Sequence, residues 1–349
     1  MLSPTTAAIV ATATATATAP GNVASPTISS IDQGTFTAQV DQLVNAAGGT
    51  TEIVVALADG TIIYDRGGAQ SMESASLYKL GIMVEIYRQR DAGLLTFDDG
   101  VYMYPGFFSE GEDVYGVGDM GSYVSVGDLL TNMITKSSNV AATALLSRVG
   151  TDNINNTLAA LGLTSTEIRW TPGLDLPVDT SIDPAGGDQT PTDAPTPDAP
   201  VDTSQHEEPT PTGRVGGIVL TAARGEVRVV QRPFADARAD GALNVTTADD
   251  VASLYMQLLR GEVVDAAASQ EMLNLLAQQQ INDRLPVLLP GDTVVAHKTG
   301  NLDGLVHDAG VIFAPAGPII VAVLTENVDE GVADDMIAQI GLMAYQLAS

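Results

Sequence analysis

Cysteine is absent from this sequence, and basic residues are scarce. Without cysteine the chain can form no disulfide, thiol nucleophile or cysteine-ligated metal site. Only 15 Lys and Arg residues stand against 43 Asp and Glu residues, which gives a formal net charge of -28 at pH 7. No basic stripe is therefore available to meet phosphate groups, so we expect no nucleic-acid partner and no docking on anionic lipid. The acidity is typical of a solvated, soluble surface.

Long apolar runs and metal-ligand patterns are also missing. No run of ~18 apolar residues occurs, so a membrane span is not predicted. The three histidines (His206, His297 and His307) show no metal-ligand spacing, and we expect neither a metal nor another cofactor. Hydrophobic residues make up 45% of the 349 positions but aromatic residues only 5%, so the core should consist mainly of Ala, Val, Leu and Ile.

The N-terminal segment, residues 1–33, is rich in Ala, Thr, Pro and Ser. It contains no Lys or Arg and no long apolar run, whereas a secretory signal needs both a basic start and an apolar stretch. We interpret it as a flexible leader or stalk. We expect a monomer that is located outside the cell or in the cell envelope.

Hydrophobic periodicity divides residues 34–349 into one helix, two strands, a helical middle, three strands and a last helix. The first two strands flank Asp59-Gly60, which is a hairpin signal. This order predicts an α+β fold: helices flank an antiparallel sheet of about five strands built from both chain ends, beside an all-helical lobe. The expected helices cover residues 35–47, 76–92, 126–135, 140–149, 246–259, 265–279 and 333–347, and the expected strands cover 52–57, 61–64, 293–298, 310–314 and 319–325.

Two stretches interrupt this pattern. Residues 98–123 are Gly-rich and are predicted to form a loop. Residues 171–213 are dense in Pro, Thr and Asp and cannot bury enough apolar surface to fold alone. A hairpin signal follows over residues 215–234, with its turn at Arg224-Gly225.

The scarce lysines stand beside serines or in short polar motifs. The chain has only Lys79, Lys136 and Lys298, and the first lies three residues after Ser76 in Ser76-Leu77-Tyr78-Lys79. On a helix, residues three apart lie on one face, so the amine could take the proton of the serine hydroxyl. Taken alone, this spacing is a weak signal, because Ser76 could be a helix cap and Lys79 a solvated lysine.

Two further motifs strengthen the hypothesis. Ser137-Ser138-Asn139 follows Lys136, and Lys298-Thr299-Gly300 follows near the end. The trio of Ser-x-x-Lys, Ser-Asp-Asn and Lys-Thr-Gly marks class A β-lactamases and penicillin-binding proteins. The chain resembles the penicillin-recognising serine hydrolase family, and specifically its class A β-lactamase-like branch, over residues 34–349 outside the 171–213 stretch. Because Ser76 and Lys298 must then meet in one site, residues 171–213 are interpreted as a loop insertion in one domain.

The resemblance implies a catalytic group of four side chains and a β-lactamase/transpeptidase-like fold. Ser76 would be the acylated nucleophile, and Lys79 would accept its proton. Ser137 would pass a proton to the leaving nitrogen. Lys298 would add positive electrostatic potential for the substrate.

The same resemblance implies a set of substrate-binding residues. Asn139 would hold the amide side chain of the substrate, and Thr299, beside Gly300, would bind its carboxylate. The backbone N–H groups of Ser76 and Asn301 would form the oxyanion hole. Some relatives carry a carboxylate-binding arginine at the position of Arg284, although a surface arginine is the alternative there.

Two departures from the family pattern bear on turnover. Ser138 stands where the family usually has Asp. The family also uses a loop glutamate to activate the deacylating water, and Thr171 occupies that position, with Asp175 in place of the following asparagine. A threonine cannot act as a general base at neutral pH, so slow deacylation is expected. Glu167 or Asp175 could substitute only if the loop were rebuilt.

The histidines are weaker candidates. His307-Asp308 invites a Ser/His/Asp interpretation, but adjacent residues of a strand point in opposite directions. The same alternation should turn His297 away from the site. His206 lies in the Pro-rich stretch, where we expect it to be solvated.

Three functions stay open from the sequence. The first is acyl transfer through an acyl-serine on a β-lactam or a related amide or ester. The second is a peptidoglycan D,D-peptidase or an esterase of the same family. The third is a non-catalytic envelope or binding module that keeps the fold.

Overall fold

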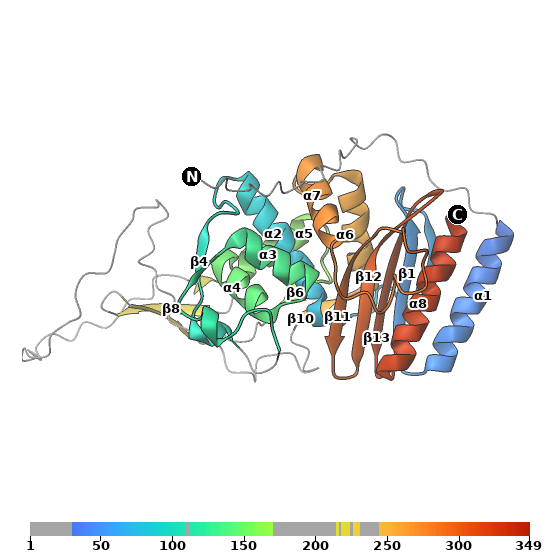
Figure 1. Cartoon of the computed structure of the whole chain (residues 1–349), viewed down its shortest axis with the longest axis horizontal. Helices are drawn as coiled ribbons and strands as arrows, with labels where there is room; N and C mark the ends of the chain where they lie inside the picture. The colour runs from blue at the N-terminus through green and yellow to red at the C-terminus, as the bar shows by residue number, and fades with distance from the viewer. Residues whose placement is uncertain (1–29, 109–111, 170–213, 216–217, 224–225, 231–243) are drawn as a thin grey trace, which may run out of the picture.

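The computed structural model describes residues 30–108, 112–169, 214–215, 218–223, 226–230 and 244–349 (Figure 1). Most of the expected leader, and the whole 171–213 insertion, lie outside these residues. The first helix, α1 (Ser30–Ala47), begins before the position 35 that periodicity indicated.

A five-stranded antiparallel sheet forms the centre of the fold, and it contains strands from both chain ends as predicted. The C-terminal strand β13 pairs with β1 along the whole length of β1, from Thr50 opposite Glu326 to Leu57 opposite Ile319. The strands in spatial order are β11 (Val295–Leu302), β12 (Leu305–Ala314), β13 (Gly317–Glu326), β1 (Thr50–Leu57) and β2 (Ile62–Arg66).

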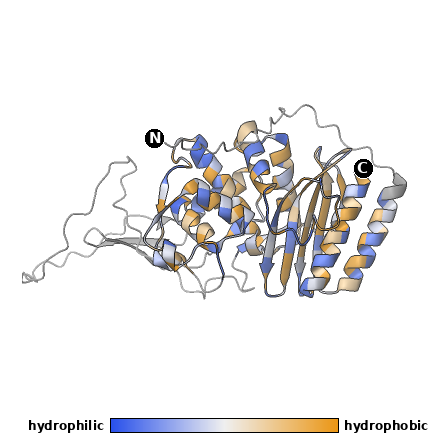
Figure 2. Ribbon diagram, viewed as in Figure 1, coloured by the Kyte–Doolittle hydropathy of each residue, from blue (hydrophilic) through white to orange (hydrophobic). Residues whose placement is uncertain are grey.

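The sheet is covered on both faces, which explains why β1 and β13 are buried almost continuously. Helices α1 and α8 (Glu330–Leu347) cover one face, and α6 (Ala248–Arg260) lies on the other (Figure 1). Figure 2 shows hydrophobic residues concentrated along the strands and polar residues interspersed along α1 and α8. The two sides of the sheet thus belong to two separate hydrophobic clusters.

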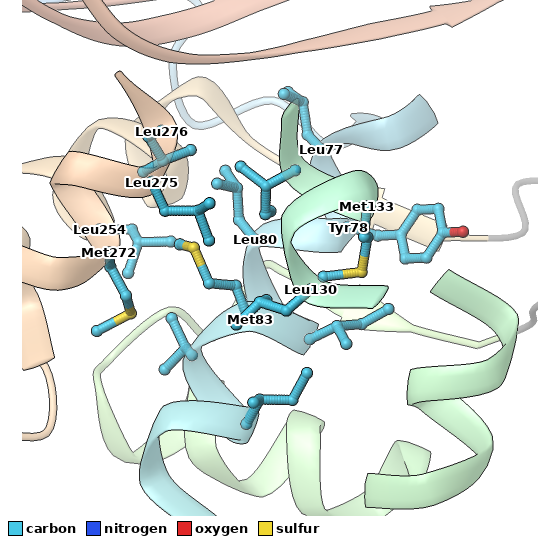
Figure 3. Close-up of a cluster of buried hydrophobic side chains, with 14 of the residues drawn as sticks. Leu77, Tyr78, Leu80, Met83, Leu130, Met133, Leu254, Met272, Leu275 and Leu276 are labelled. Atoms are coloured by element: carbon cyan, nitrogen blue, oxygen red, sulfur yellow. The ribbon is translucent and has the colours of Figure 1, made fainter. Parts of the chain in front are cut away.

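The helical lobe is organised around α2 (Lys79–Asp91), which is buried on nearly every side. Residues 79–87 of this helix are all buried, so it needs neighbours on all sides. Met83 lies between Leu254 and Met272 on one side and Leu130 on the other (Figure 3). The surrounding lobe helices are α3 (Val126–Thr135), α4 (Asn139–Val149), α5 (Thr151–Ala160) and α7 (Ala266–Leu276).

Several boundaries differ from the sequence prediction. The expected helix 76–92 is a 3₁₀ turn, η1 (Ala75–Tyr78), followed by α2. Strand β12 begins at Leu305, whereas the sequence predicted a start at residue 310. The predicted start was too late because the buried polar pair His307-Asp308 interrupts the apolar pattern. Helix α5 was not predicted, since it buries only Ile154 and Leu158.

Short strands complete the described structure. β3 (Met72–Glu73), β10 (Asn244–Thr246) and β6 (Glu167–Ile168) form a small antiparallel sheet. The expected loop 98–123 contains the pair β4 (Gly100–Tyr102) and β5 (Tyr123–Ser125) and the short 3₁₀ turns η2 (Pro105–Phe107) and η3 (Val117–Asp119). The predicted hairpin is present as β8 (Ile218–Ala223) and β9 (Glu226–Val230), with β7 (Arg214–Val215) beside β8. Among the described residues, no helix is both long and apolar enough to cross a membrane.

Candidate active site

Ser76 lies in the 3₁₀ turn η1, directly before α2, and its side chain is partly exposed. The residue before it, Ala75, has φ +42°, a left-handed conformation that non-glycine residues rarely adopt. Such conformations cost roughly 1–3 kcal/mol and persist where the surrounding structure fixes them, often at functional sites. The backbone therefore holds Ser76 in a constrained turn.

Lys79 lies one turn later and is fully buried. Its Nζ is 3.1 Å from Ser76 Oγ, 3.1 Å from Ser137 Oγ and 2.8 Å from Asn139 Oδ1, and it also contacts the Ser137 carbonyl oxygen at 2.5 Å. Burial, and then the charge of Lys298, lowers the pKa of Lys79 well below its usual value, while Asp113 acts in the opposite direction. A buried amine of this kind is suited to accept the proton of Ser76 at neutral pH.

Ser137 connects the two buried lysines. It occupies the turn between α3 and α4 with φ +57°, and its Oγ accepts a hydrogen bond from Lys298 Nζ at 3.0 Å. Four side chains from three separate parts of the sequence thus form a continuous chain of polar contacts: Ser76, Lys79, Ser137 and Lys298.

Lys298 enters the site from β11, the edge strand of the sheet. Its Nζ also donates to the Thr299 carbonyl oxygen at 2.8 Å. Burial is the main cause that lowers the pKa of Lys298 to about 7, while Asp308 raises it and Arg284 lowers it further. Lys298 is therefore a second buried amine in the site, and its charge depends on pH near neutrality.

Gly300 allows β11 to approach the turn that carries Ser76. A Cβ added at Gly300 would lie 3.2 Å from Ala75 Cβ and 3.2 Å from His307 Cδ2, closer than ordinary van der Waals contact. His307 is held in place because its Nδ1 accepts from Thr325 N at 3.1 Å and its Nε2 donates to the Glu73 carbonyl at 2.9 Å. The Lys-Thr-Gly motif thus needs its glycine for close packing.

Arg284 is buried behind β11, not on the surface. Its Nε donates to Asp334 Oδ1 at 2.7 Å, and its terminal nitrogens donate to the His307 carbonyl at 3.1 Å and to Asn301 Oδ1 at 2.8 Å. These contacts support the strand that carries Thr299, Gly300 and Asn301. The predicted role in carboxylate binding stays a prediction, and the guanidinium would have to exchange one of these partners to fulfil it.

The remaining histidine predictions agree with the alternation of the strands. His297 points away from Lys298 and is buried against Asp308 (Nδ1–Oδ1 2.8 Å) and Asn282 (Nε2–Oδ1 3.0 Å). His307 and Asp308 have separate partners, so they form no His/Asp pair with each other. His206 lies outside the described residues.

Asp113 is the residue that the sequence did not single out. Its carboxylate accepts from Ser138 Oγ at 2.6 Å, from Asn139 N at 2.8 Å and from Val140 N at 3.2 Å. It lies in the loop between β4 and β5, where no motif or periodicity marks it. The departure at Ser138 was the one available signal that a carboxylate should be sought nearby.

The residues expected to govern deacylation are less fully described. Thr171 and Asp175 lie outside the described residues. Glu167 is exposed and accepts from Arg169 Nε at 2.7 Å and from Arg169 Nη2 at 2.5 Å. In the described part of the chain, no group of three or more His, Asp or Glu side chains is placed to hold a metal ion.

The chain is similar to known proteins in its sequence family and in its fold. A model of the beta-lactamase enzyme family matches residues 35–348. The structure is similar to a β-lactamase from Sphaerobacter thermophilus DSM 20745, with a TM-score of 0.67 and 24% identity over 92% of this chain and 98% of that chain. It is also similar to an ancestral class A β-lactamase, GNCA, with a TM-score of 0.65 and 21% identity over 89% of this chain and 99% of that one.

PBP-A is a further similar structure, with a TM-score of 0.63 and 20% identity over 93% of this chain and 98% of that one. A variant of PBP-A has been solved as an acyl-enzyme complex with penicillin G, and it gives a TM-score of 0.62. No curated protein sequence matches the chain. At these identities the similarity to solved structures shows a shared fold.

Proposed function

Because this chain belongs to the beta-lactamase enzyme family and is a β-lactamase-like serine hydrolase, we propose that it forms an acyl-enzyme on Ser76 with β-lactams or related amides and esters, and releases the acyl group slowly. The observation that carries the proposal is the unbroken contact chain from Ser76 Oγ through Lys79 and Ser137 to Lys298 Nζ. Such an arrangement can activate a serine and deliver a proton to a leaving group.

Acylation begins with the transfer of the Ser76 hydroxyl proton to the neutral Lys79 amine while Oγ attacks the substrate carbonyl carbon. The carbonyl oxygen becomes an oxyanion, which the N–H groups of Ser76 and Asn301 stabilise. Ser76 lies in the first turn of η1, where the N–H groups have no partner within the turn. When the intermediate collapses, the C–N bond breaks. The nitrogen takes the proton of Ser137 Oγ, and Ser137 recovers one from Lys79 or Lys298.

Substrate binding uses the groups that surround this chain. The carboxylate of a penicillin would lie near Thr299 and the Lys298 ammonium group, which attracts an anion when it is protonated. Asn139 is exposed at the other side of Ser137, where it can bind the amide side chain of the substrate. Gly300 keeps β11 close enough for both sets of contacts to act on one molecule.

Slow deacylation rests on Thr171. A threonine hydroxyl does not ionise near neutral pH, so it cannot take a proton from the attacking water. Among the described residues, two carboxylates considered above are otherwise engaged: Glu167 with Arg169, and Asp113 with four donors. The acyl-enzyme should therefore accumulate.

Mass spectrometry of the intact protein after incubation with penicillin G tests this proposal. We expect a stoichiometric adduct that maps to Ser76, that is absent from Ser76→Ala, and that persists much longer than one turnover of an efficient hydrolase. Thr171→Glu should shorten the lifetime of the adduct. If wild type shows no adduct and no hydrolysis, the proposal is wrong. Fast nitrocefin hydrolysis, unaffected in Thr171→Ala, would show that another base activates the water.

A D,D-peptidase or esterase is the second candidate, and the loss of the loop glutamate at Thr171 favours it over an efficient β-lactamase. Release of D-Ala from a muropeptide, or of p-nitrophenol from a short ester, would identify such an activity. Both activities use the same acyl-serine. We also propose an extracellular or cell-envelope location, which fractionation of the producing cell would test.

A further inference from the structure

The turn that carries Ser137 adopts a conformation that needs external support. Ser137 has φ +57°, in the left-handed region, where a serine is strained. On its α3 side the turn is held by Asn132, whose carbonyl oxygen accepts from Lys136 N at 3.1 Å and from Ser138 N at 3.2 Å. This conformation places Ser137 Oγ between Lys79 and Lys298, so any relaxation would separate it from both lysines.

Asp113 supports the other side of the turn. One oxygen accepts from Ser138 Oγ at 2.6 Å and from Tyr115 N at 3.2 Å, and the other accepts from Asn139 N at 2.8 Å and Val140 N at 3.2 Å. Ser138 Oγ in turn accepts from Ala141 N at 3.0 Å as the N-cap of α4. These contacts fix residues 138–141, which directly follow Ser137, and Tyr115 in the loop itself.

The same loop is attached a second time. Tyr115 OH accepts from Asn132 Nδ2 at 2.9 Å, and Asn132 is the residue whose carbonyl oxygen supports the turn on its α3 side. The loop therefore bridges α3 and α4 across the Ser137 turn. Asp113 contacts the start of α4, and Tyr115 contacts α3.

We propose that Asp113 is a positioning residue that holds Ser137 and Asn139 in their reactive placement, and that this loop carboxylate compensates for the serine at position 138. The inference rests on the proposed acyl-serine chemistry. Since four donors occupy the two oxygens of Asp113, it does not act as a base itself. Its effect passes through the backbone of residues 138–140 and through the hydroxyl of Ser138.

Acylation rates of Asp113→Asn and Asp113→Ala, measured with a fluorescent penicillin, test the proposal. We expect the first-order acylation rate to fall about 10- to 100-fold, because a misplacement of about 1 Å in a catalytic group has this effect. The change in the initial binding constant should be smaller. Asp119→Asn is the matched control: Asp119 accepts from Gly116 N within the same loop, and its loss should leave acylation unchanged.

A charge exchange separates positioning from general loss of structure. In Asp113→Ser/Ser138→Asp the carboxylate moves to the N-cap of α4, where it can accept from the N–H groups of the first turn and from the new serine. The exchange should recover at least tenfold of the lost rate. Asp113 also raises the pKa of Lys79, and the other charged group acting on that lysine is Lys298, so Asp113→Asn should move the acidic limb of the acylation–pH profile to lower pH. A merely structural loss would not move that limb.

Wild-type acylation rates in folded Asp113→Ala would overturn the proposal, as would an exchange variant no faster than the single variants. If the wild-type protein is not acylated at all, the proposed function fails, but the positioning role is still decided by structure. A crystal structure of Asp113→Ala should show Ser137 out of its left-handed conformation and its Oγ beyond hydrogen-bond distance of Lys298. A turn unchanged in that variant would refute the positioning role independently of any substrate.

Discussion

Replacing Gly300 by alanine would test whether close packing of β11 on the η1 turn sets the reactivity of Ser76, the proposed nucleophile. The added Cβ would lie 3.2 Å from Ala75 Cβ, 3.2 Å from His307 Cδ2 and 3.3 Å from His307 Cβ. Neither neighbour can yield easily. Ala75 is already in a left-handed conformation, and both ring nitrogens of His307 are hydrogen-bonded.

The expected cost follows from these contacts. Relieving them requires β11 and η1 to separate by a few tenths of an ångström. Overpacking of this kind typically costs ~1–3 kcal/mol, and the newly buried methyl group returns ~0.8 kcal/mol. We expect a net loss of stability of ~0.2–2 kcal/mol. Because the shift moves Lys298 and Asn301 relative to Ser76, acylation should slow by about tenfold or more.

The assay combines a urea melt with the acylation rate toward a fluorescent penicillin. Gly127→Ala is the matched control, since its Cβ would meet Phe97 Cβ at 3.3 Å and Phe97 O at 3.3 Å. Gly127 lies ten residues before Ser137, about 15 Å away along α3, so its variant should keep the acylation rate whatever its effect on stability.

A second substitution can rescue the first. Ala75→Gly removes one of the close contacts and suits the φ of +42°, so Gly300→Ala/Ala75→Gly should recover part of the rate and part of the stability. The contacts with His307 remain in this double variant, which is why we expect partial recovery. If Gly300→Ala acylates at the wild-type rate with an unchanged melt, the contact does not limit the site and the reasoning is refuted.

Three further predictions follow from the buried groups. Because the pKa of Lys298 is about 7, the affinity of the free protein for an anionic penicillin should weaken as the pH rises from ~6 to ~8; an affinity that is flat over this range would contradict the assignment. Burial lowers the pKa of His307 to about 4, below its unfolded value of 6.5, so the unfolded state binds the proton more tightly. The folded state should therefore lose up to ~3 kcal/mol of stability as the pH falls from 6.5 to 4. His307→Gln should reduce that loss in urea melts at pH 7.5 and 4.5, and an identical pH dependence would count against it. Met83→Ala should cost ~2–5 kcal/mol in the same melts, whereas exposed Leu94→Ala should cost less than ~0.5 kcal/mol; equal effects would argue against the packing in Figure 3.

The sequence was sufficient to predict the parts of the fold that depend on local periodicity. Ser76 and Lys79 share a face because three residues make about one helical turn, and the structure places their functional atoms 3.1 Å apart. The shared sheet was predictable because apolar runs near both ends had the length and β-branched composition of buried strands.

The remaining features depend on contacts between distant residues. Helix α5 is secured partly by Asn155, which donates to the Ile168 carbonyl and accepts from Ile168 N, and its asparagines alone favour turns. The burial of Arg284 depends on carbonyl acceptors from β11 and β12 that no local pattern reveals. Asp113 reaches α4 across 25 residues from a loop without periodicity, so only the three-dimensional structure identifies its partners.

The order of strands has a consequence for how the reactive centre arises during synthesis. Strand β13 lies between β12 and β1, so the N-terminal strand keeps one unpaired edge until the last tenth of the chain has been made. Strand pairings between residues so distant in sequence form late, because the entropic cost of closing the loop comes before the contacts that offset it. The segment with Ser76 is thus translated long before Lys298 can reach it. Until the sheet is complete, Lys298 is not held beside Ser137, so the full contact chain from Ser76 to Lys298 exists only in the folded sheet.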